Sequence, residues 1–182
     1  MRVGVFGGSF NPPHVGHAMI ASYLRWTEQV DVVWFVPAFE HAFGKSLAPW
    51  EQRVHALKAL AALVGAEVST VESTLPRPSY TIRTLLALQE QNPSVEFRLI
   101  MGADVHAQLP LWRDHERIVA EFNPIVVGRD GYAPVPGVPS FPAVSSTEIR
   151  ERMARGASVD ALVPRVVLEA WAQGAGSSSS AG

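Results

Sequence analysis

Residues 3–17 read VGVFGGSFNPPHVGH, and the rest of the chain is organised around this stretch. The apolar residues 3–6 predict a short buried strand, and the sequence from Val15 onward predicts a helix. A glycine-rich and proline-rich loop lies between them. A strand that leads through such a loop into a helix N-terminus gathers free backbone N–H groups at one place, which suits an anion. The stretch therefore predicts a phosphate site after the first strand.

Two histidines, His14 and His17, stand three residues apart at the start of this helix. An imidazole can donate to a phosphate oxygen, and a nearby anion favours its cationic form. The same spacing occurs in metal sites, but the chain has no cysteine and no nearby carboxylate offers a third ligand. The plainest alternative is a tight turn with two surface histidines. A turn alone would not require two glycines, two prolines and two histidines together.

These residues also carry a family resemblance. The run GGSFNPPHVGH resembles the signature of the nucleotidylyltransferase superfamily, a T/H-x-G-H motif preceded by a G-G/T-x-F-D/N-P loop. Its NPPH portion most resembles the nicotinate (or nicotinamide) mononucleotide adenylyltransferases. The stretch SSTEIR at residues 145–150 resembles the second signature of that family, S-S/T-T-x-I-R. The resemblance extends over roughly residues 1–171.

Composition sets wider limits on the chain. Its 182 residues, 47% hydrophobic and 18% charged, are typical of one globular domain. A net charge of −2 gives no general attraction to nucleic acid or to a membrane surface, so neither is expected as a partner. The sequence shows no signal-peptide pattern and no apolar run that could cross a bilayer, and we expect a cytoplasmic protein. A homo-oligomer is left open.

The alternation of strands and helices predicts an α/β fold. Strands are expected at residues 3–6, 30–36, 67–71, 97–101 and 122–127, and helices at 15–28, 50–64, 80–91, 103–109, 116–121 and from Ser145 to about Arg155. This order predicts a Rossmann-like, doubly wound and mainly parallel sheet with helices on both faces, whose ligands bind at the carboxyl ends of the strands. We expect one nucleotidylyltransferase domain at residues 1–171 and a low-complexity, disordered tail at 172–182.

The resemblance implies a set of catalytic and ATP-binding residues. The catalytic residues are His14, His17 and Arg150. The ATP-binding residues are Gly7, Gly8, Ser9, Phe10, Gly102, Asp104, Ser145, Ser146 and Thr147. Of these, the G-x-D segment that ends at Asp104 would take ribose hydroxyls. Without the resemblance, Asp104 would be a simple helix cap, and Ser145 with Glu148 would be an ordinary capping box.

The resemblance also implies where the acceptor binds. Residues 78–81, PSYT, resemble a family segment S-Y-T-x-D-T whose backbone lies against the pyridine substituent, so Tyr80 and Thr81 are acceptor residues. Trp112 matches a tryptophan that stacks on the pyridine ring. Two positions depart from the pattern: Arg83 replaces an aspartate, and FEHAFGK at residues 39–45 replaces a P-P-H-K segment, in which Lys45 stands in for the lysine.

The function that the resemblance implies is adenylyl transfer from ATP to nicotinate mononucleotide, giving the deamido dinucleotide and pyrophosphate for NAD biosynthesis. The candidate set holds no obvious nucleophile, which favours direct in-line attack without a covalent intermediate. Mg²⁺ would accompany ATP without ligands from protein side chains. Three alternatives stay open: nicotinamide mononucleotide as acceptor, another nucleotidylyltransferase that uses phosphopantetheine or a cytidylyl donor, and a nucleotide-binding sensor without turnover.

Overall fold

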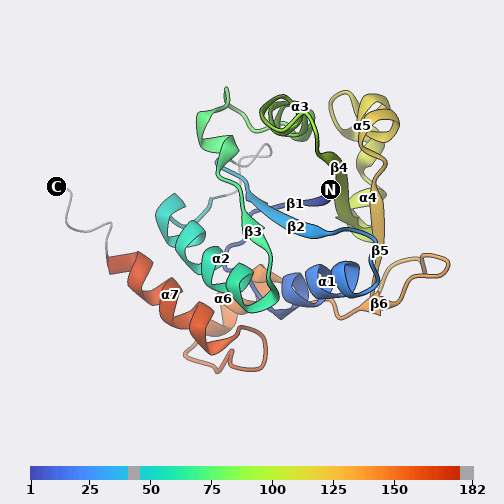
Figure 1. Ribbon diagram of the computed structural model, residues 1–182. Coiled ribbons are helices and arrows are strands. Elements are labelled where there is room, and N and C mark those ends of the chain that lie inside the picture. Colours follow the sequence, from blue (N-terminus) through green and yellow to red (C-terminus); the bar gives the residue numbers. More distant parts are fainter. Residues whose placement is uncertain (41–45, 177–182) are drawn as a thin grey trace.

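Figure 1 shows a computed structural model of the chain, which describes residues 1–40 and 46–176. The elements follow in the order β1 (Arg2–Gly8), α1 (Val15–Trp26), β2 (Val32–Pro37), α2 (Trp50–Val64), β3 (Glu67–Val68), the 3₁₀ turn η1 (Val71–Thr74), α3 (Thr81–Gln91), β4 (Glu96–Gly102), α4 (Ala103–His106), the 3₁₀ turn η2 (Leu109–Leu111), α5 (His115–Phe122), β5 (Ile125–Arg129), β6 (Ser140–Phe141), α6 (Ser146–Ala154) and α7 (Arg165–Gly176).

The strands form one sheet in the order β3-β2-β1-β4-β5-β6, and every neighbouring pair is parallel. On β1, Val5 pairs with Trp34 of β2 on one side and with Leu99 of β4 on the other. The chain moves outward from β1 in one direction and from β4 in the other. The carboxyl ends of β1 and β4 therefore flank the topological switch point, where open α/β sheets bind their ligands. The predicted doubly wound fold is confirmed.

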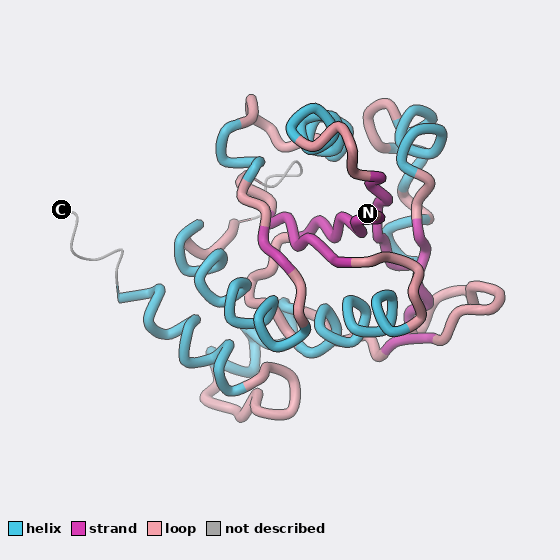
Figure 2. Tube along the Cα trace, in the orientation of Figure 1, coloured by secondary structure: helices cyan, strands magenta, loops and turns pink. Residues whose placement is uncertain are grey.

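Two layers of helices cover the two faces of this sheet, as Figure 2 shows with the magenta strands between cyan helices. Helices α1, α2, α6 and α7 share one apolar core, which includes Leu24, Leu57, Ile149 and Val167. Helices α3 and α5 share the other core, which includes Leu85 and Ile118. Each fully buried aliphatic side chain of this kind contributes about 1.5–3 kcal/mol relative to exposure. The apolar stripe of each helix thus faces the sheet, and the handedness of the crossover connections sets which face of the sheet the helix covers.

The structure shifts several predicted boundaries. The expected strand at 67–71 is only Glu67–Val68, and residues 71–74 turn into η1. The helix expected at 80–91 begins one residue later as α3, with Tyr80 as its N-cap. Residues 140–141, which lie outside the expected strands, form β6. The two short strands are set by partners elsewhere in the sheet, because β3 pairs with β2 and β6 pairs with β5.

Helix α7 has no counterpart among the expected helices, and it continues past residue 171 to Gly176. It lies along α2 in Figure 1. A Cβ on Gly174 would lie 2.7 Å from the Cα of Gln52, and the Gln52 side chain donates to the carbonyl of Trp171. Gly174 therefore allows α7 to pack closely against α2. The low-complexity sequence around it does not indicate this role. Within the described residues, no helix is both long enough and apolar enough to cross a membrane.

Candidate active site

A cavity of about 520 Å³ opens at the switch point, between the carboxyl ends of β1, β4 and β5 and the N-terminal ends of α1 and α6. Its volume lies within the range of about 300–1,000 Å³ that is usual for small-molecule sites. The predicted residues that line it are Gly7, Ser9, Phe10, His14, His17, Gly102, Asp104, Ser145, Ser146, Thr147 and Arg150. The structure thus brings together eleven of the twelve predicted catalytic and ATP-binding residues.

Gly8 is the exception, and its place in the loop explains why. Phe10 adopts a φ of 46° and is 1% exposed, because its ring folds beneath the loop against Phe35 and His17 at centroid distances of 5.5 and 4.8 Å. A Cβ on Gly8 would stand 3.2 Å from that ring, whereas one on Gly7 would meet nothing within 4 Å. Gly8 therefore makes room for Phe10, and Gly7 leaves its backbone open.

The two histidines stack on each other at the start of α1. Their ring centroids are 3.8 Å apart with an interplanar angle of 28°. The backbone N–H of His14 donates to Nδ1 of His17 over 3.2 Å. This hydrogen bond assigns the proton of neutral His17 to Nε2. Nδ1 of His14 is buried and has no hydrogen-bond partner among the described residues.

Both imidazoles are neutral at pH 7 in the free protein. Burial lowers the pKa of His14 to about 4, and the nearby Arg129 guanidinium contributes to this shift. Burial also lowers the pKa of His17 well below its ordinary value, and His14 and Arg129 add to this effect. An anion placed beside the rings would act in the opposite direction, since it favours the charged form. A phosphate that binds beside the rings would therefore raise the pKa values of His14 and His17.

Helix α6 is tied directly to the first loop. The hydroxyl of Ser146 donates to the carbonyl of Pro12 over 2.9 Å, and Nη1 of Arg150 donates to the carbonyl of Asn11 over 2.6 Å. The predicted N-cap is confirmed, because Oγ of Ser145 accepts from the backbone N–H of Glu148 at 3.1 Å. The N–H groups of Ser146 and Thr147 have no acceptor within the helix and remain for a ligand.

Helix α1 offers fewer free donors than the sequence indicates. The N–H of Val15 donates to the carbonyl of Leu162 over 2.9 Å, so the segment before α7 takes the first donor of the helix. The N–H of His17 bonds the carbonyl of His14 at 3.0 Å. Of the first three positions, Gly16 keeps a backbone donor without a helical acceptor. Two of the first three backbone N–H groups of α1 are therefore already bonded within the protein.

Arg129 is a cavity residue that the sequence reasoning missed. It is the last residue of β5, and its Nη1 lies 2.7 Å from Oδ2 of Asp104. Oδ1 of Asp104 is buried and accepts no hydrogen bond within the described residues. The pair therefore presents one free carboxylate oxygen beside a guanidinium. The signal that could have indicated it is a charged residue at the carboxyl end of a predicted strand.

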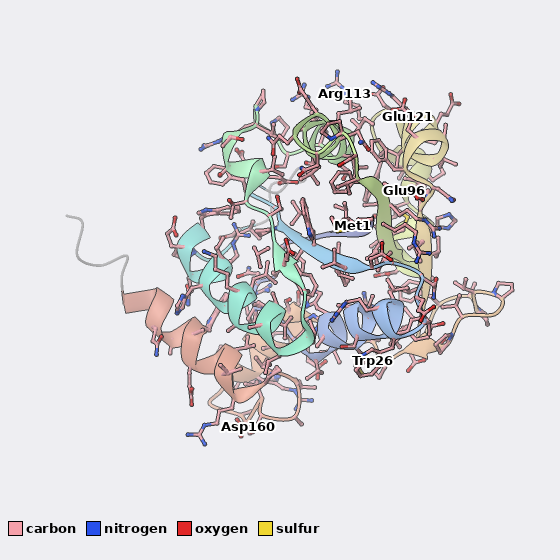
Figure 3. The ribbon with its side chains drawn as sticks, viewed as in Figure 1. Met1, Trp26, Glu96, Arg113, Glu121 and Asp160 are labelled. Atoms are coloured by element: carbon pink, nitrogen blue, oxygen red, sulfur yellow. The ribbon has the colours of Figure 1, made fainter. Side chains whose placement is uncertain are left out.

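The predicted acceptor residues lie elsewhere. Tyr80, Thr81 and Trp112 do not line the cavity, and Tyr80 and Trp112 pack against the core of the α3–α5 layer. The Tyr80 ring has the guanidinium carbons of Arg83 at 5.0 Å and Arg113 at 5.1 Å from its centroid. Figure 3 labels Arg113 on this layer and Trp26 on the opposite one. Arg83 thus lies against Tyr80, and Lys45 lies outside the described residues.

Among the described residues that line the cavity, Asp104 supplies the one carboxylate that could contact a divalent ion. Residues 1–40 and 46–176 contain no group of three or more histidine, cysteine, aspartate or glutamate side chains placed to bind a metal. Mg²⁺ needs few protein ligands, because it keeps several waters and binds phosphate oxygens. A magnesium ion that arrives on a polyphosphate is compatible with this donor set.

Comparison with known proteins gives consistent results. Residues 5–152 match the family model described as cytidylyltransferase-like. A probable nicotinate-nucleotide adenylyltransferase of Anaeromyxobacter sp. (strain K) is 47% identical over 171 residues, covering 92% of this chain and 91% of the relative. A second, from Thermus thermophilus, is 39% identical over 175 residues, covering 92% of this chain and 94% of that relative.

Solved structures agree at the level of the fold. Plasmodium falciparum nicotinic acid mononucleotide adenylyltransferase complexed with NaAD is 16% identical, with a TM-score of 0.76 over 94% of this chain and 95% of that one. A putative nicotinate-nucleotide adenylyltransferase from Vibrio parahaemolyticus is 20% identical, with a TM-score of 0.72 over 94% and 92% of the two chains.

Proposed function

Because the chain belongs to the cytidylyltransferase-like family and, within it, to the nicotinate-nucleotide adenylyltransferases, we propose that it transfers the adenylyl group of ATP to nicotinate mononucleotide. The products are the deamido dinucleotide and pyrophosphate, a step of NAD biosynthesis. The observation that carries this proposal is the joining of the two signature segments at one cavity, through Ser146 with Pro12 and Arg150 with Asn11.

The cavity supports direct transfer. In the described part of the chain, neither imidazole hydrogen-bonds a serine or threonine hydroxyl, so no activated nucleophile is formed there. The acceptor phosphate oxygen attacks the α-phosphorus of ATP, and the bond from that phosphorus to the bridging oxygen of pyrophosphate breaks. Catalysis then consists of positioning and charge stabilisation. Two anions meet at this point, and cationic donors offset their repulsion.

His14 and His17 supply donors that respond to the substrate. Their lowered pKa values keep them neutral until a polyphosphate enters, and its charge then favours protonation. Negative charge grows on the leaving pyrophosphate as the bond breaks, so donors near it bind the transition state more strongly than the ground state. Arg150 and the free N–H groups at the start of α6 hold the outer phosphates.

The nucleoside and the acceptor occupy the remaining parts of the site. The free Oδ1 of Asp104 is an acceptor for a ribose hydroxyl of ATP, and Arg129 holds the other oxygen of that carboxylate. The pyridine nucleotide binds beyond the cavity, against Tyr80 and Thr81 at the start of α3 and against Trp112 just after η2. The N–H groups of that helix start can hold a nicotinate carboxylate, and Arg83 and Arg113 add positive charge nearby. Mg²⁺ bound to the phosphates of ATP would stabilise their charge.

The test is a pyrophosphate-release assay with ATP, Mg²⁺ and each acceptor in turn, with the dinucleotide product identified by mass. We expect kcat/KM for nicotinate mononucleotide to exceed that for nicotinamide mononucleotide by about tenfold or more, because a charged acceptor group binds cationic and helix N–H donors more strongly. Equal or better use of the amide would assign the other acceptor. Tight ATP binding with no release from any acceptor, phosphopantetheine included, would indicate a sensor.

A further inference from the structure

Buried polar side chains gather in one network beside the cavity. Among the described residues, six polar or charged side chains are buried: Asn11, His14, Gln52, Arg53, Glu72 and Thr84. Four of them, Asn11, Arg53, Glu72 and Thr84, belong to one path of hydrogen bonds that runs between the two layers of helices. Burying a polar group costs free energy unless it is hydrogen-bonded. The clustering of four such groups beside the cavity therefore points to a specific role for them.

The centre of the network is a single peptide plane. Nη1 of Arg53 donates to the carbonyl of Ala38 over 2.8 Å, and the N–H of Phe39 donates to Oε2 of Glu72 over 3.0 Å. The carbonyl and the N–H belong to the same peptide bond, which lies just after the end of β2. A guanidinium therefore holds one side of this plane and a carboxylate holds the other. Both are charge-assisted hydrogen bonds, which are stronger than neutral ones.

Arg53 connects this plane to the phosphate side of the site. Its side chain is 1% exposed, and it also donates to the carbonyls of Ser9 at 2.9 Å and Ala48 at 3.0 Å. The N–H of Ala48 donates to Oδ1 of Asn11 over 3.2 Å. Ser9 and Asn11 line the cavity, as do residues 46 and 47 just before Ala48. One arginine thus fixes two walls of the cavity relative to β2.

Glu72 connects the same plane to the opposite layer. Its Oε1 accepts from the hydroxyl of Thr84 over 2.9 Å. Thr84 lies in the first turns of α3, and its backbone N–H bonds the carbonyl of Tyr80, the N-cap of that helix, at 3.2 Å. The carboxylate therefore joins the end of β2 to the start of α3.

We propose that Arg53 and Glu72 are positioning residues that clamp the Ala38–Phe39 peptide from its two sides and thereby set the ATP half of the site at a fixed distance from the acceptor half. The location of the acceptor half at α3 rests on the function proposed above. Arg53 acts through Ser9 and Ala48 on the ATP side, and Glu72 acts through Thr84 on the acceptor side. The two halves of the site must keep this fixed distance, because in-line attack requires the acceptor oxygen and the α-phosphorus to be aligned at close range.

The sharpest test separates the KM values of the two substrates. Thr84→Val removes the hydroxyl with little change of shape, and we expect it to raise the acceptor KM about tenfold while the ATP KM stays within about twofold. Thr84→Ser keeps the hydroxyl and is expected to restore the acceptor KM. The matched control is Thr74→Val, because the Thr74 hydroxyl donates to the carbonyl of Val71 and not to the Glu72 carboxylate.

Arg53→Lys tests the other side of the clamp. A lysine has the charge but lacks the fork that reaches three carbonyls, so the KM values of both ATP and the acceptor should rise by about fivefold or more. Arg25→Lys is the control, since Arg25 donates to the carbonyl of Val64 and does not line the cavity. It should lower Tm without changing either KM. If Arg53→Lys and Thr84→Val also changed only Tm, the clamp would be structural and the proposal wrong.

Amide hydrogen exchange tests the clamp without relying on any activity. In the wild-type protein the Phe39 amide should be protected, and Glu72→Ala should speed its exchange about tenfold or more because the acceptor is gone. Glu72→Gln keeps an oxygen and should preserve most of the protection. Equal exchange in wild type and Glu72→Ala would refute the clamp. A wild-type protein that makes no dinucleotide from nicotinate mononucleotide, yet shows this exchange pattern, would contradict only the proposed function.

Discussion

The two halves of the site differ in how the fold holds them. On the α1–α6 side, all the predicted catalytic and ATP-binding residues but Gly8 line one cavity, and some bond each other, as His14 does with His17. On the α3–α5 side, Tyr80 and Trp112 pack on an apolar core and lie outside that cavity. The first half is built from two short signatures whose own backbone makes the contacts. The second half consists of separate residues whose positions are set by packing against other elements. A sequence motif can therefore show which residues these are, but not where they lie in the fold.

The largest effect should follow loss of a histidine on the first side. His17→Ala is expected to lower kcat by about 10³-fold with only a small change in the ATP KM, because the imidazole binds charge that develops in the transition state. Steady-state kinetics with ATP as the varied substrate measure this. His55→Ala is the control, since His55 is exposed and contacts Gln173. Equal changes in kcat and in ATP affinity would instead indicate uniform binding.

A smaller effect is expected at Arg150. Its guanidinium lines the cavity and is held by the carbonyl of Asn11, so Arg150→Ala should raise the KM for ATP and the inhibition constant for pyrophosphate by about 30-fold. Arg155→Ala removes a guanidinium just after the same helix, where it bonds the carbonyl of Glu151 and does not line the cavity. If the two variants behaved alike, a local role for Arg150 would be excluded.

Trp112 tests the second side of the comparison. Trp112→Ala should raise the acceptor KM about tenfold and leave the ATP KM unchanged, because an indole face binds a cationic pyridine ring. Trp112→Phe keeps an aromatic ring against the core and should recover most of the loss. Trp26→Ala is the control, since this tryptophan is 81% exposed on the opposite layer. An unchanged acceptor KM in Trp112→Ala would place the pyridine ring elsewhere.

The smallest effect concerns stability and pH. The pKa of His14 is about 4 in the folded protein and about 6.5 in the unfolded chain, so between these values the unfolded chain binds more protons. The stabilising contribution of neutral His14 is present above pH 6.5 and is lost as the pH falls toward 4. Melting curves from pH 7.5 to pH 5 should show a larger fall in Tm for wild type than for His14→Asn, by about 3–6 °C. Identical falls would show that other groups cause it.

Much of the first half of the site was open to prediction from the sequence. The run of residues 7–17 and the stretch 145–150 both contain their own turn and capping chemistry. Ser145 caps α6 as predicted, although the Glu148 carboxylate accepts from Arg152 and does not complete the predicted capping box. Arg129 could not be found in the same way, because it becomes a cavity residue only through the pairing of β5 with β4 and its contact with Asp104. The sequence also does not show that Gly8 stays outside the cavity lining, because that depends on the inward turn of the Phe10 ring two residues later.

The sequence by itself determined the order of helices and strands from β1 to β5, the parallel sheet and the two signature segments, because period, caps and glycine-rich turns are local properties of the chain. It did not indicate β6 or α7. Only the tertiary structure decided that Arg53 and Glu72 hold one peptide plane, that α7 packs on α2 through Gly174, and that Tyr80 and Trp112 lie outside the cavity. The physical reason is distance along the chain. A buried charge is tolerated only where partners from remote segments pair with it, and a local sequence pattern does not show which residues those partners are.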